Sequence, residues 1–190
     1  MLSLAQAQWI LSTLEKAGYP AYLVGGCVRD ALLDQPTYDY DITTAAKPEE
    51  TQAVFRDVKQ DPVGIRHGTV RLRLPGGVAE VTTFRTEGGY DDNRHPGWVK
   101  FVPDIETDLA RRDFTVNAIA WSPRRGYADP FGGQADLKQG ILRCVGEPDR
   151  RFREDALRIL RGIRFAARFH LTVEPATMEA MVQNAHLVQN

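Results

Sequence analysis

The sequence has 190 residues, 43% of them hydrophobic and 26% charged, and a net charge of −1, which is typical of an ordinary globular protein of one or two domains. No hydrophobic run approaches the ~20 residues of a membrane span, and the start has no signal-peptide pattern, so we expect a cytoplasmic protein without a membrane segment. Cys27 and Cys144 match no metal-ligand spacing and are predicted to be free thiols. Global charge gives no support for nucleic-acid binding, but eight arginines lie between Arg143 and Arg168 and form a local basic cluster.

The first half of the chain alternates helical and strand patterns. A helix is predicted from Ser3, as its cap, to near Gly18, and a short buried strand over residues 22–24. A second helix over residues 27–33 precedes a strand over residues 38–43, which is rich in β-forming residues. Residues 48–55 begin with proline and two glutamates, which is typical of a helix start. Residues 69–74 and 78–84 flank Pro-Gly-Gly and predict a hairpin.

The second half is predicted to be mainly helical. Residues 86–103 are polar and rich in glycine and proline, which predicts a mobile loop. Helices are expected over residues 104–121, 153–170 and 174–188, with a turn-rich stretch over residues 124–133. The sequence therefore predicts an α+β head over residues 1–140, followed by an all-helical neck over residues 141–190.

A glycine pair follows the first predicted strand. Gly25 and Gly26 open a helix, so backbone N–H groups there could approach a phosphate closely. Arg29, one turn into that helix, could add charge-assisted bonds to a triphosphate. Taken alone, a Gly-Gly turn is more often only a turn.

Two carboxylates follow about a dozen residues later. Asp39 and Asp41 are two apart, and on a strand they would point to the same face. Their like charges repel, which favours a bound cation, and hard oxygen ligands suit Mg²⁺. The alternative is an exposed edge strand with two acids of no function; the preceding glycine turn favours the metal site.

Two further motifs combine opposite charges. Residues 111–118 read RRDFTVNA, and residues 154–164 read EDALRILRGIR. On one continuous helix, Ile159, Leu160 and Ile163 would share an apolar face, and the charged residues Asp155, Arg158, Arg161, Arg164 and Arg168 would wind around the opposite side. The alternative is a solvated, ion-paired surface helix. Gly162 costs about 1 kcal/mol inside a helix, so it predicts close approach of another element or a ligand.

In this order, the motifs resemble the class II tRNA nucleotidyltransferase and bacterial poly(A) polymerase family of the DNA polymerase β superfamily. The matching segments are LVGGCVRDALL at 23–33, DYD at 39–41, EVTTFR at 80–85, RRDFTVNAIAW at 111–121, DPFGGQADLKQGILRCVGEPDRRF at 129–152 and EDALRILRGIRFAARF at 154–169. The resemblance implies a head with a mixed sheet flanked by helices, then a helical neck. Members continue into body and tail domains that hold tRNA, and we expect those domains to be absent from this chain.

The resemblance also implies roles for individual residues. Asp39 and Asp41 would bind metal, and Gly26, Arg29 and Arg112 would contact the triphosphate. Asp155 and Arg158 would read the incoming base, and the positions of Arg161 and Arg164 would contribute to nucleotide binding. The segment around residues 90–102 resembles the family's flexible loop, which helps the switch from C to A addition.

The expected activity is template-independent addition of C and A from CTP and ATP to the 3′ end of tRNA, with Mg²⁺ in a two-metal mechanism. A CC-only or A-only variant fits equally. Glu80, on the second hairpin strand, is the candidate third catalytic carboxylate, although an edge-strand glutamate without a role is the alternative. Two other functions stay open: poly(A) tailing of RNA, and a non-catalytic nucleotide- or RNA-binding fragment. The intact Asp39–Asp41 pair favours an enzyme.

Overall fold

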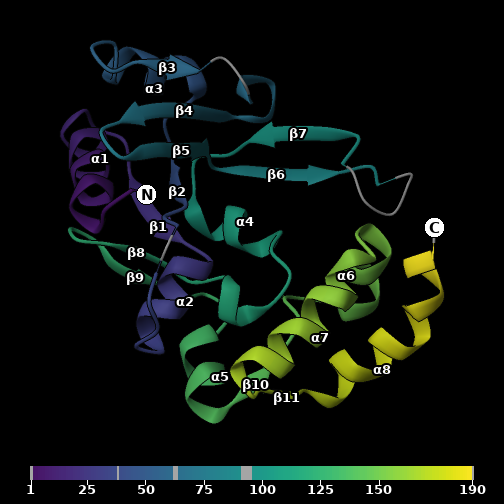
Figure 1. Ribbon diagram of the computed structural model, residues 1–190. Coiled ribbons are helices and arrows are strands. Elements are labelled where there is room, and N and C mark those ends of the chain that lie inside the picture. The colour runs from purple at the N-terminus through teal and green to yellow at the C-terminus, as the bar shows by residue number, and fades with distance from the viewer. Residues whose placement is uncertain (1, 38, 62–63, 91–95, 190) are drawn as a thin grey trace.

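The computed structural model describes residues 2–37, 39–61, 64–90 and 96–189, and its first part is built on a seven-stranded sheet (Figure 1). The strand order is β3-β4-β5-β2-β1-β8-β9. The β2–β5 pair is parallel and the other neighbouring pairs are antiparallel, so the sheet is mixed, as expected. Its strands are β1 (Ala21–Val24), β2 (Ile42–Thr44), β3 (Gln60–Asp61), β4 (Thr69–Leu74), β5 (Gly77–Thr83), β8 (Ala120–Ser122) and β9 (Gly126–Ala128).

Three helices accompany the sheet where the sequence predicts them. These are α1 (Leu4–Lys16), α2 (Gly26–Leu32) and α3 (Pro48–Val54). The side chain of Ser3 caps α1 by accepting the N–H of Gln6, and Gln6 bonds back to the N–H of Ser3. The apolar face of α1 is buried, and this confirms the predicted helix. Its buried hydrophobic residues are Ala7, Ile10, Leu11 and Leu14.

The loop predicted over residues 86–103 is wrong. Strands β6 (Arg85–Gly88) and β7 (Trp98–Phe101) pair as an antiparallel ribbon, which extends from the sheet above the neck (Figure 1). The ring of Trp98 covers Gly88, where a Cβ would lie 2.6 Å from Trp98 Cζ2. The glycine therefore serves close packing within a strand pair, whereas its sequence context indicated a turn. Part of the expected flexible loop, residues 91–95, lies outside the described residues.

The single helix predicted over residues 104–121 is also wrong. Helix α4 (Ile105–Ala110) ends before Arg111, a 3₁₀ turn covers Thr115–Asn117, and the chain then enters β8. Residues 113–120 are all buried. The segment exchanges backbone bonds with the start of the neck: Thr115 N–H donates to Arg143 O, and Val145 N–H to Asp113 O. These long-range bonds outweigh the local helical pattern.

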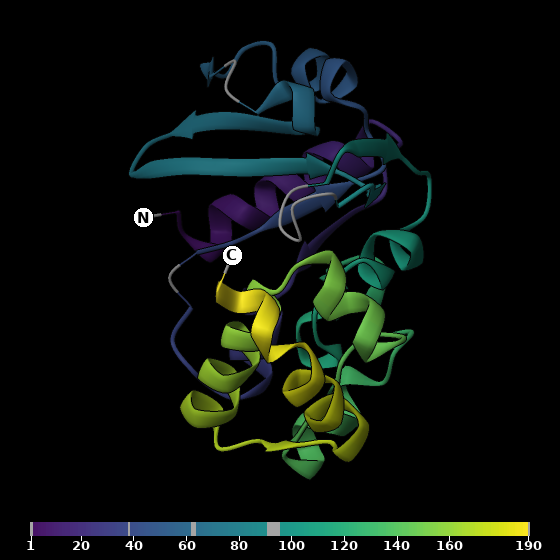
Figure 2. The same ribbon diagram turned by 90° about the vertical axis from the view of Figure 1, so that its right-hand side faces the viewer.

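The neck departs from the all-helical prediction at one place. Within residues 141–190, helices α6 (Pro148–Glu154), α7 (Leu157–Phe169) and α8 (Pro175–Asn184) are accompanied by a short parallel pair, β10 (Ile141–Leu142) with β11 (Thr172–Val173), while helix α5 (Gly133–Gln139) comes just before the predicted boundary. The views in Figures 1 and 2 show the neck helices gathered below the sheet, beside α2 and α4. None of the described helices is both long and apolar enough to cross a membrane. The domain boundary near residue 140 stays a prediction.

Helix α7 also presents a different face from the one predicted. Leu160 and Ile163 are 48% and 57% exposed, whereas Ile159, Gly162 and Phe165 are buried. A Cβ at Gly162 would lie 2.1 Å from Met181 Cε of α8 and 2.8 Å from Phe114 Cζ. The predicted close approach at Gly162 is thus confirmed. It sets the rotation of α7, because the helix packs through its glycine and not through Leu160 and Ile163.

Candidate functional site

The turn between β1 and α2 requires glycine for two reasons. Gly25 has φ of 75°, a backbone conformation that residues with a side chain rarely adopt. A Cβ there would also lie 3.1 Å from Nη1 of Arg112 and 3.9 Å from Oδ2 of Asp41. The turn therefore places its backbone beside an arginine and a carboxylate that are distant in sequence.

Asp39 and Asp41 do not lie on a strand, which corrects the prediction for residues 38–43. Strand β2 begins at Ile42, and residue 38 is outside the described residues. The Val24 N–H donates to Asp41 O at 3.1 Å, which ties the lead-in segment to β1. Both carboxylates nevertheless line one cavity of about 430 Å³, so their proximity is as expected.

Glu80 lines the same cavity. The parallel register of Ile42 with Val81 brings Asp41 alongside Glu80 from the neighbouring strand. Burial is the main cause that raises the pKa of Asp41, and the charges of Asp39 and Glu80 raise it further, while Arg112 opposes them. Glu80 also pairs with Arg71 at 2.6 Å. Four carboxylates, those of Asp39, Asp41, Asp61 and Glu80, thus line this cavity together with Arg71 and Arg73.

The carboxylates of this cavity fit a Mg²⁺ ion that takes its other ligands from water and substrate. They do not fit a metal site made of protein ligands alone. Among the residues that the structure describes, no three His, Cys, Asp or Glu side chains form a metal-binding group. Mg²⁺ usually takes one or two carboxylates and completes its shell with water and substrate phosphate oxygens. Asp39 and Asp41 are the residues here that could hold such an ion, because their like charges favour a cation between them.

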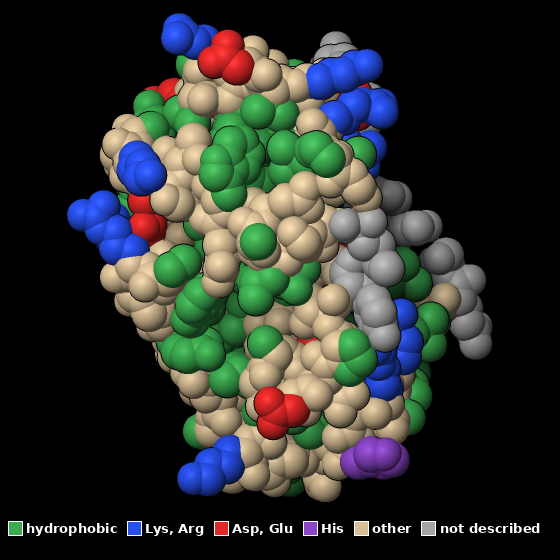
Figure 3. Space-filling model, turned by 60° about the vertical axis from the view of Figure 1, so that its left-hand side comes forward, with side chains coloured by type: hydrophobic (Ala, Val, Ile, Leu, Met, Phe, Trp, Pro, Cys, Tyr) green, Lys and Arg blue, Asp and Glu red, His purple; other side chains and the backbone are tan. Residues whose placement is uncertain are grey.

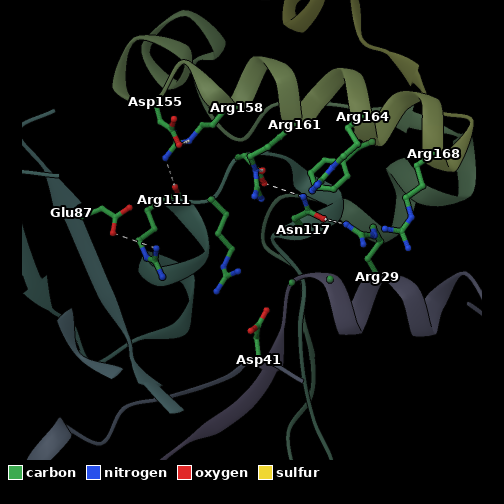
Figure 4. Close-up of a pocket in the computed structure, with 15 residues that line it drawn as sticks. Arg29, Asp41, Glu87, Arg111, Asn117, Asp155, Arg158, Arg161, Arg164 and Arg168 are labelled. Atoms are coloured by element: carbon green, nitrogen blue, oxygen red, sulfur yellow. Dashed lines mark hydrogen bonds and ion pairs between the residues drawn. The ribbon is translucent and has the colours of Figure 1, made fainter. Parts of the chain in front are cut away.

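A second cavity of about 420 Å³ adjoins the first at Asp41 (Figure 4). It lies between the glycine turn, the segment after α4, and α7. Its charged and polar lining residues are Arg29, Asp41, Glu87, Arg111, Arg112, Asp113, Asn117, Asp155, Arg158, Arg161, Arg164 and Arg168. The arginines outnumber the acids, so an anion of several charges would be attracted. By contrast, Figure 3 shows the α1 side of the molecule, where hydrophobic side chains gather and basic ones lie at the margins.

Arg29 is held rigidly at one end of this cavity. Its Nη1 donates to Asn117 Oδ1 at 2.5 Å and its Nε to Asp30 at 2.9 Å. Its guanidinium lies 4.2 Å from the ring centroid of Phe169 in α7, which is a cation–π contact between head and neck. The role of Asn117 was not predicted from the sequence, although the residue is part of the RRDFTVNA motif; only the structure shows it bonded to Arg29.

Arg112 lines the cavity and has incomplete hydrogen bonding. Its Nη2 approaches Asp108 at 3.4 Å, while its Nε is buried and has no hydrogen-bond partner among the described residues. Burial is the main cause that lowers the pKa of Arg112, and Arg111 lowers it further. A bound phosphate would supply the missing acceptor, since arginine stays protonated in proteins.

Asp155 and Arg158 meet at the junction of α6 and α7, not along one helix. Asp155 follows the end of α6, with φ of −144° and ψ of 101°. Its Oδ1 accepts the Leu157 N–H at 3.0 Å, and Arg158 Nε lies 3.9 Å from its Oδ2. Burial raises the pKa of Asp155, and the charge of Arg158 opposes that rise. Both side chains line the cavity, and their role in reading the base stays a prediction.

The arginine side chains of α7 are held by backbone carbonyl groups and by the carboxylate of Asp113. Arg158 is buried and donates to the carbonyl oxygens of Arg151 and Arg111, each at 3.2 Å. Arg161 Nε donates to Asp113 at 2.8 Å. Asp113 in turn accepts from Asn117 at 3.1 Å. Arg164 lies 5.2 Å from the ring centroid of Phe165 and lines the cavity. The structure thus brings the predicted nucleotide-binding arginines into one cavity, while Glu80 lines the adjoining one.

A mixed sheet, a glycine turn, a carboxylate pair and an arginine-rich cavity define the class of protein expected from the motifs, a nucleotidyltransferase of the polymerase β type. The sequence pattern of the Poly A polymerase head domain matches residues 21–143. The chain therefore belongs to this family, and the resemblance noted from the sequence is confirmed.

The chain is similar to a CCA-adding enzyme of Streptococcus pyogenes serotype M5, strain Manfredo, at 52% identity over 180 residues, which is 95% of this chain and 44% of the relative. The crystal structure of the Bacillus stearothermophilus CCA-adding enzyme in complex with CTP is similar with a TM-score of 0.86 and 46% identity, over 97% of this chain and 44% of that one. A tRNA nucleotidyltransferase complexed with a primer tRNA and an incoming ATP analog has a TM-score of 0.74 and 29% identity, over 94% of this chain and 50% of that one. The chain therefore spans about 44% of the length of the curated relatives it matches.

Proposed function

We propose that this chain forms the catalytic part of a nucleotidyltransferase that adds C and A from CTP and ATP to the 3′ end of tRNA. The observation that carries the proposal is a single cavity that contains Asp41, a series of arginines, and the Asp155–Arg158 pair. In one bound nucleotide, Asp41 would lie beside the reacting phosphate, the arginines would lie along the triphosphate, and the Asp155–Arg158 pair would lie beside the base. The names of the Streptococcus and Bacillus relatives, both CCA-adding enzymes, support the same substrates.

Nucleotidyl transfer depends on positioning and charge stabilisation more than on covalent help from the protein. In this proposal the Gly25–Gly26 backbone, Arg29 and Arg112 bind the triphosphate, and Arg161 and Arg164 add positive charge along it. Asp39 and Asp41 would hold Mg²⁺. A bound Mg²⁺ would stabilise the negative charge on the attacking and leaving oxygens. Glu80 is a third candidate carboxylate, and its ion pair with Arg71 would have to open for it to reach a cation.

Asp155 and Arg158 would select the base by hydrogen-bond pattern. An ionised carboxylate only accepts and a guanidinium only donates. Cytosine and adenine each present an amino donor beside a ring-nitrogen acceptor, whereas uracil and guanine present the reverse. The contacts of Arg158 with two backbone carbonyls keep its guanidinium in place, so the pattern is set before the nucleotide arrives.

The proposal is tested by incubating the protein, at the full length of its curated relatives so that the parts that hold tRNA are present, with Mg²⁺, each nucleoside triphosphate, and tRNA that ends before CCA. Incorporation limited to two C residues and one A supports it. A run of A residues instead supports poly(A) polymerase activity, a second candidate that the description of the matched family favours. Binding of CTP without incorporation would indicate the non-catalytic alternative. We expect the activity in the cytoplasm, where thiols stay reduced; Cys27 and Cys144 are both free, as predicted.

A further inference from the structure

Another cavity, of about 470 Å³, lies against β1, β8 and β9 and shares no described lining residue with the two cavities of the candidate site. Leu23 of β1 lies opposite Trp121 of β8, and Trp121 lies opposite Tyr127 of β9. Directly opposed residues of neighbouring strands point to the same face of a sheet. The three side chains therefore form one row, and all three line this cavity.

Two helices border the row without covering it. Helix α1 contributes Leu4 and Gln8, which lie one turn apart on the same face, and α2 contributes Cys27, Val28 and Ala31. Leu4 stays 46% exposed and Tyr127 50% exposed. Helix α1 and strands β8 and β9 lie on the side that Figure 3 turns toward the viewer, where hydrophobic side chains gather. The volume is within the range of about 300–1,000 Å³ that small-molecule sites have.

The charge of this cavity is opposite to that of the nucleotide cavity. Asp34 is the one charged residue among its described lining residues, whereas arginines predominate in the nucleotide cavity. A triphosphate would therefore meet no cation here, and a positively charged ligand would be attracted. The faces of the Trp121 and Tyr127 rings favour a cation as well.

The backbone holds Asp34 in place at the end of α2. Its φ is 53°, its N–H donates to Ala31 O at 3.3 Å, and the following N–H, of Gln35, donates to Asp30 O at 2.8 Å. Within the described part of the chain, no hydrogen bond or ion pair engages its carboxylate. The carboxylate is thus positioned by its backbone and available to a ligand.

A row of aromatic and apolar side chains with one fixed carboxylate defines the chemistry of the ligand. We infer that this cavity binds a planar aromatic molecule that carries a protonated amine, with its ring against Trp121 and Tyr127 and its ammonium group at Asp34. The amides of Gln8 and Gln35, which also line the cavity, supply further hydrogen-bonding groups. The site is separate from nucleotide binding and does not depend on the proposed function.

The test compares two compounds with the same indole ring and side chains of similar length: tryptamine, which ends in an ammonium group, and indolepropionate, which ends in a carboxylate. Ligand-observed NMR titrations of the protein should show that tryptamine binds at least about tenfold more tightly, the order of one charge-assisted hydrogen bond. A saturating concentration of CTP should not displace tryptamine, because CTP would occupy the arginine-rich cavity.

Three variants locate the compound. Asp34→Asn should weaken tryptamine binding about tenfold and keep the fold, because asparagine also adopts a positive φ. Tyr127→Ala should weaken the binding of tryptamine through the lost ring contact. The matched control is Asp57→Asn, which removes a carboxylate whose side chain is 94% exposed outside this cavity, and it should bind tryptamine as the wild type does.

The inference is overturned if the wild type does not bind tryptamine, if the two compounds bind equally, or if Asp34→Asn binds tryptamine as tightly as Asp57→Asn does. Unchanged tryptamine affinity in Tyr127→Ala contradicts the position of the ring. Displacement of tryptamine by CTP also overturns the inference, because the compound would then lie in the nucleotide cavity.

Discussion

Asp155 follows the end of α6 and Arg158 lies in the first turn of α7, and the two face each other with 3.9 Å between Asp155 Oδ2 and Arg158 Nε. Asp155 uses its Oδ1 to accept the Leu157 N–H. One oxygen of Asp155 therefore caps the start of α7, and the other lies beside Arg158 at the cavity. The capping bond of Oδ1 and the position of Oδ2 at the cavity are therefore two separate functions of Asp155, and substitutions can test each one.

This division predicts different effects for two variants of Asp155. Asp155→Asn can keep the capping bond through its amide oxygen and would then present an N–H donor to the base. It should lower discrimination against UTP and GTP, with stability close to wild type. Asp155→Ala loses the cap as well and should be less stable by about 0.5–2 kcal/mol. Nucleotide binding to the chain by calorimetry, together with thermal unfolding, checks both; unchanged preference for CTP and ATP in Asp155→Asn would rule out base reading by this residue.

The carboxylate pair predicts that Mg²⁺ stabilises the folded protein. Mg²⁺ should raise the Tm of the wild type, because a ligand that binds only the folded state stabilises it, and should have little effect on Asp41→Asn. Transfer by Asp39→Asn or Asp41→Asn should fall by several orders of magnitude. Calorimetric scans with and without Mg²⁺ measure the first effect. An equal Mg²⁺ shift in both proteins would show that the cation binds elsewhere.

The raised pKa of Asp41 predicts a pH dependence with a definite sign. Burial and the charges of Asp39 and Glu80 make its ionised form less favourable in the folded state. Without Mg²⁺, protonated Asp41 therefore contributes stability at low pH that is lost as pH rises through the raised pKa. At neutral pH and without Mg²⁺, Asp41→Asn should therefore unfold at a higher temperature than the wild type, by a small margin because water screens the partly exposed carboxylate.

The difference in Tm between Asp41→Asn and the wild type should shrink on acidification, and Mg²⁺ affinity should fall at the same time because protons compete for the carboxylate. Thermal unfolding across a pH series without divalent cation follows the first change, and calorimetric Mg²⁺ titrations follow the second. A variant less stable than the wild type at neutral pH contradicts the prediction.

Gly162 predicts an effect opposite to helix propensity. On an isolated helix, Gly→Ala would stabilise by about 1 kcal/mol. In α7 the added Cβ would meet Phe114 Cζ at 2.8 Å and Met181 Cε at 2.1 Å, so Gly162→Ala should destabilise by about 1–3 kcal/mol through overpacking. The control is Ala167→Gly, at an exposed position of the same helix, which should destabilise by propensity alone. Urea unfolding compares them; a more stable Gly162→Ala would mean that the contact yields easily.

Elements of the fold with strong local signals could be predicted from the sequence. Ser3 as a cap, the apolar pattern of α1, and the Pro-Gly-Gly turn of the β4–β5 hairpin each act over a few residues, so the structure follows them. The ribbon of β6 and β7 could not be predicted, because its glycines serve the packing of Trp98 and look like turn residues in isolation. The long helix expected over residues 104–121 failed for a related reason, since Asp113 and Thr115 bond to the neck.

The sequence by itself determined the chemistry of the site: a glycine turn, the Asp39–Asp41 pair, and the arginines of three motifs in order. Only the tertiary structure decided how they meet. The packing of Gly162 against Phe114 sets the rotation of α7, which turns Arg158 inward and leaves Leu160 and Ile163 exposed. Asp41 lines both the arginine-rich cavity and the cavity of the carboxylates, so the tertiary structure joins the two at this residue. Such relationships depend on close packing and long-range backbone pairing, which side-chain periodicity along one segment does not encode.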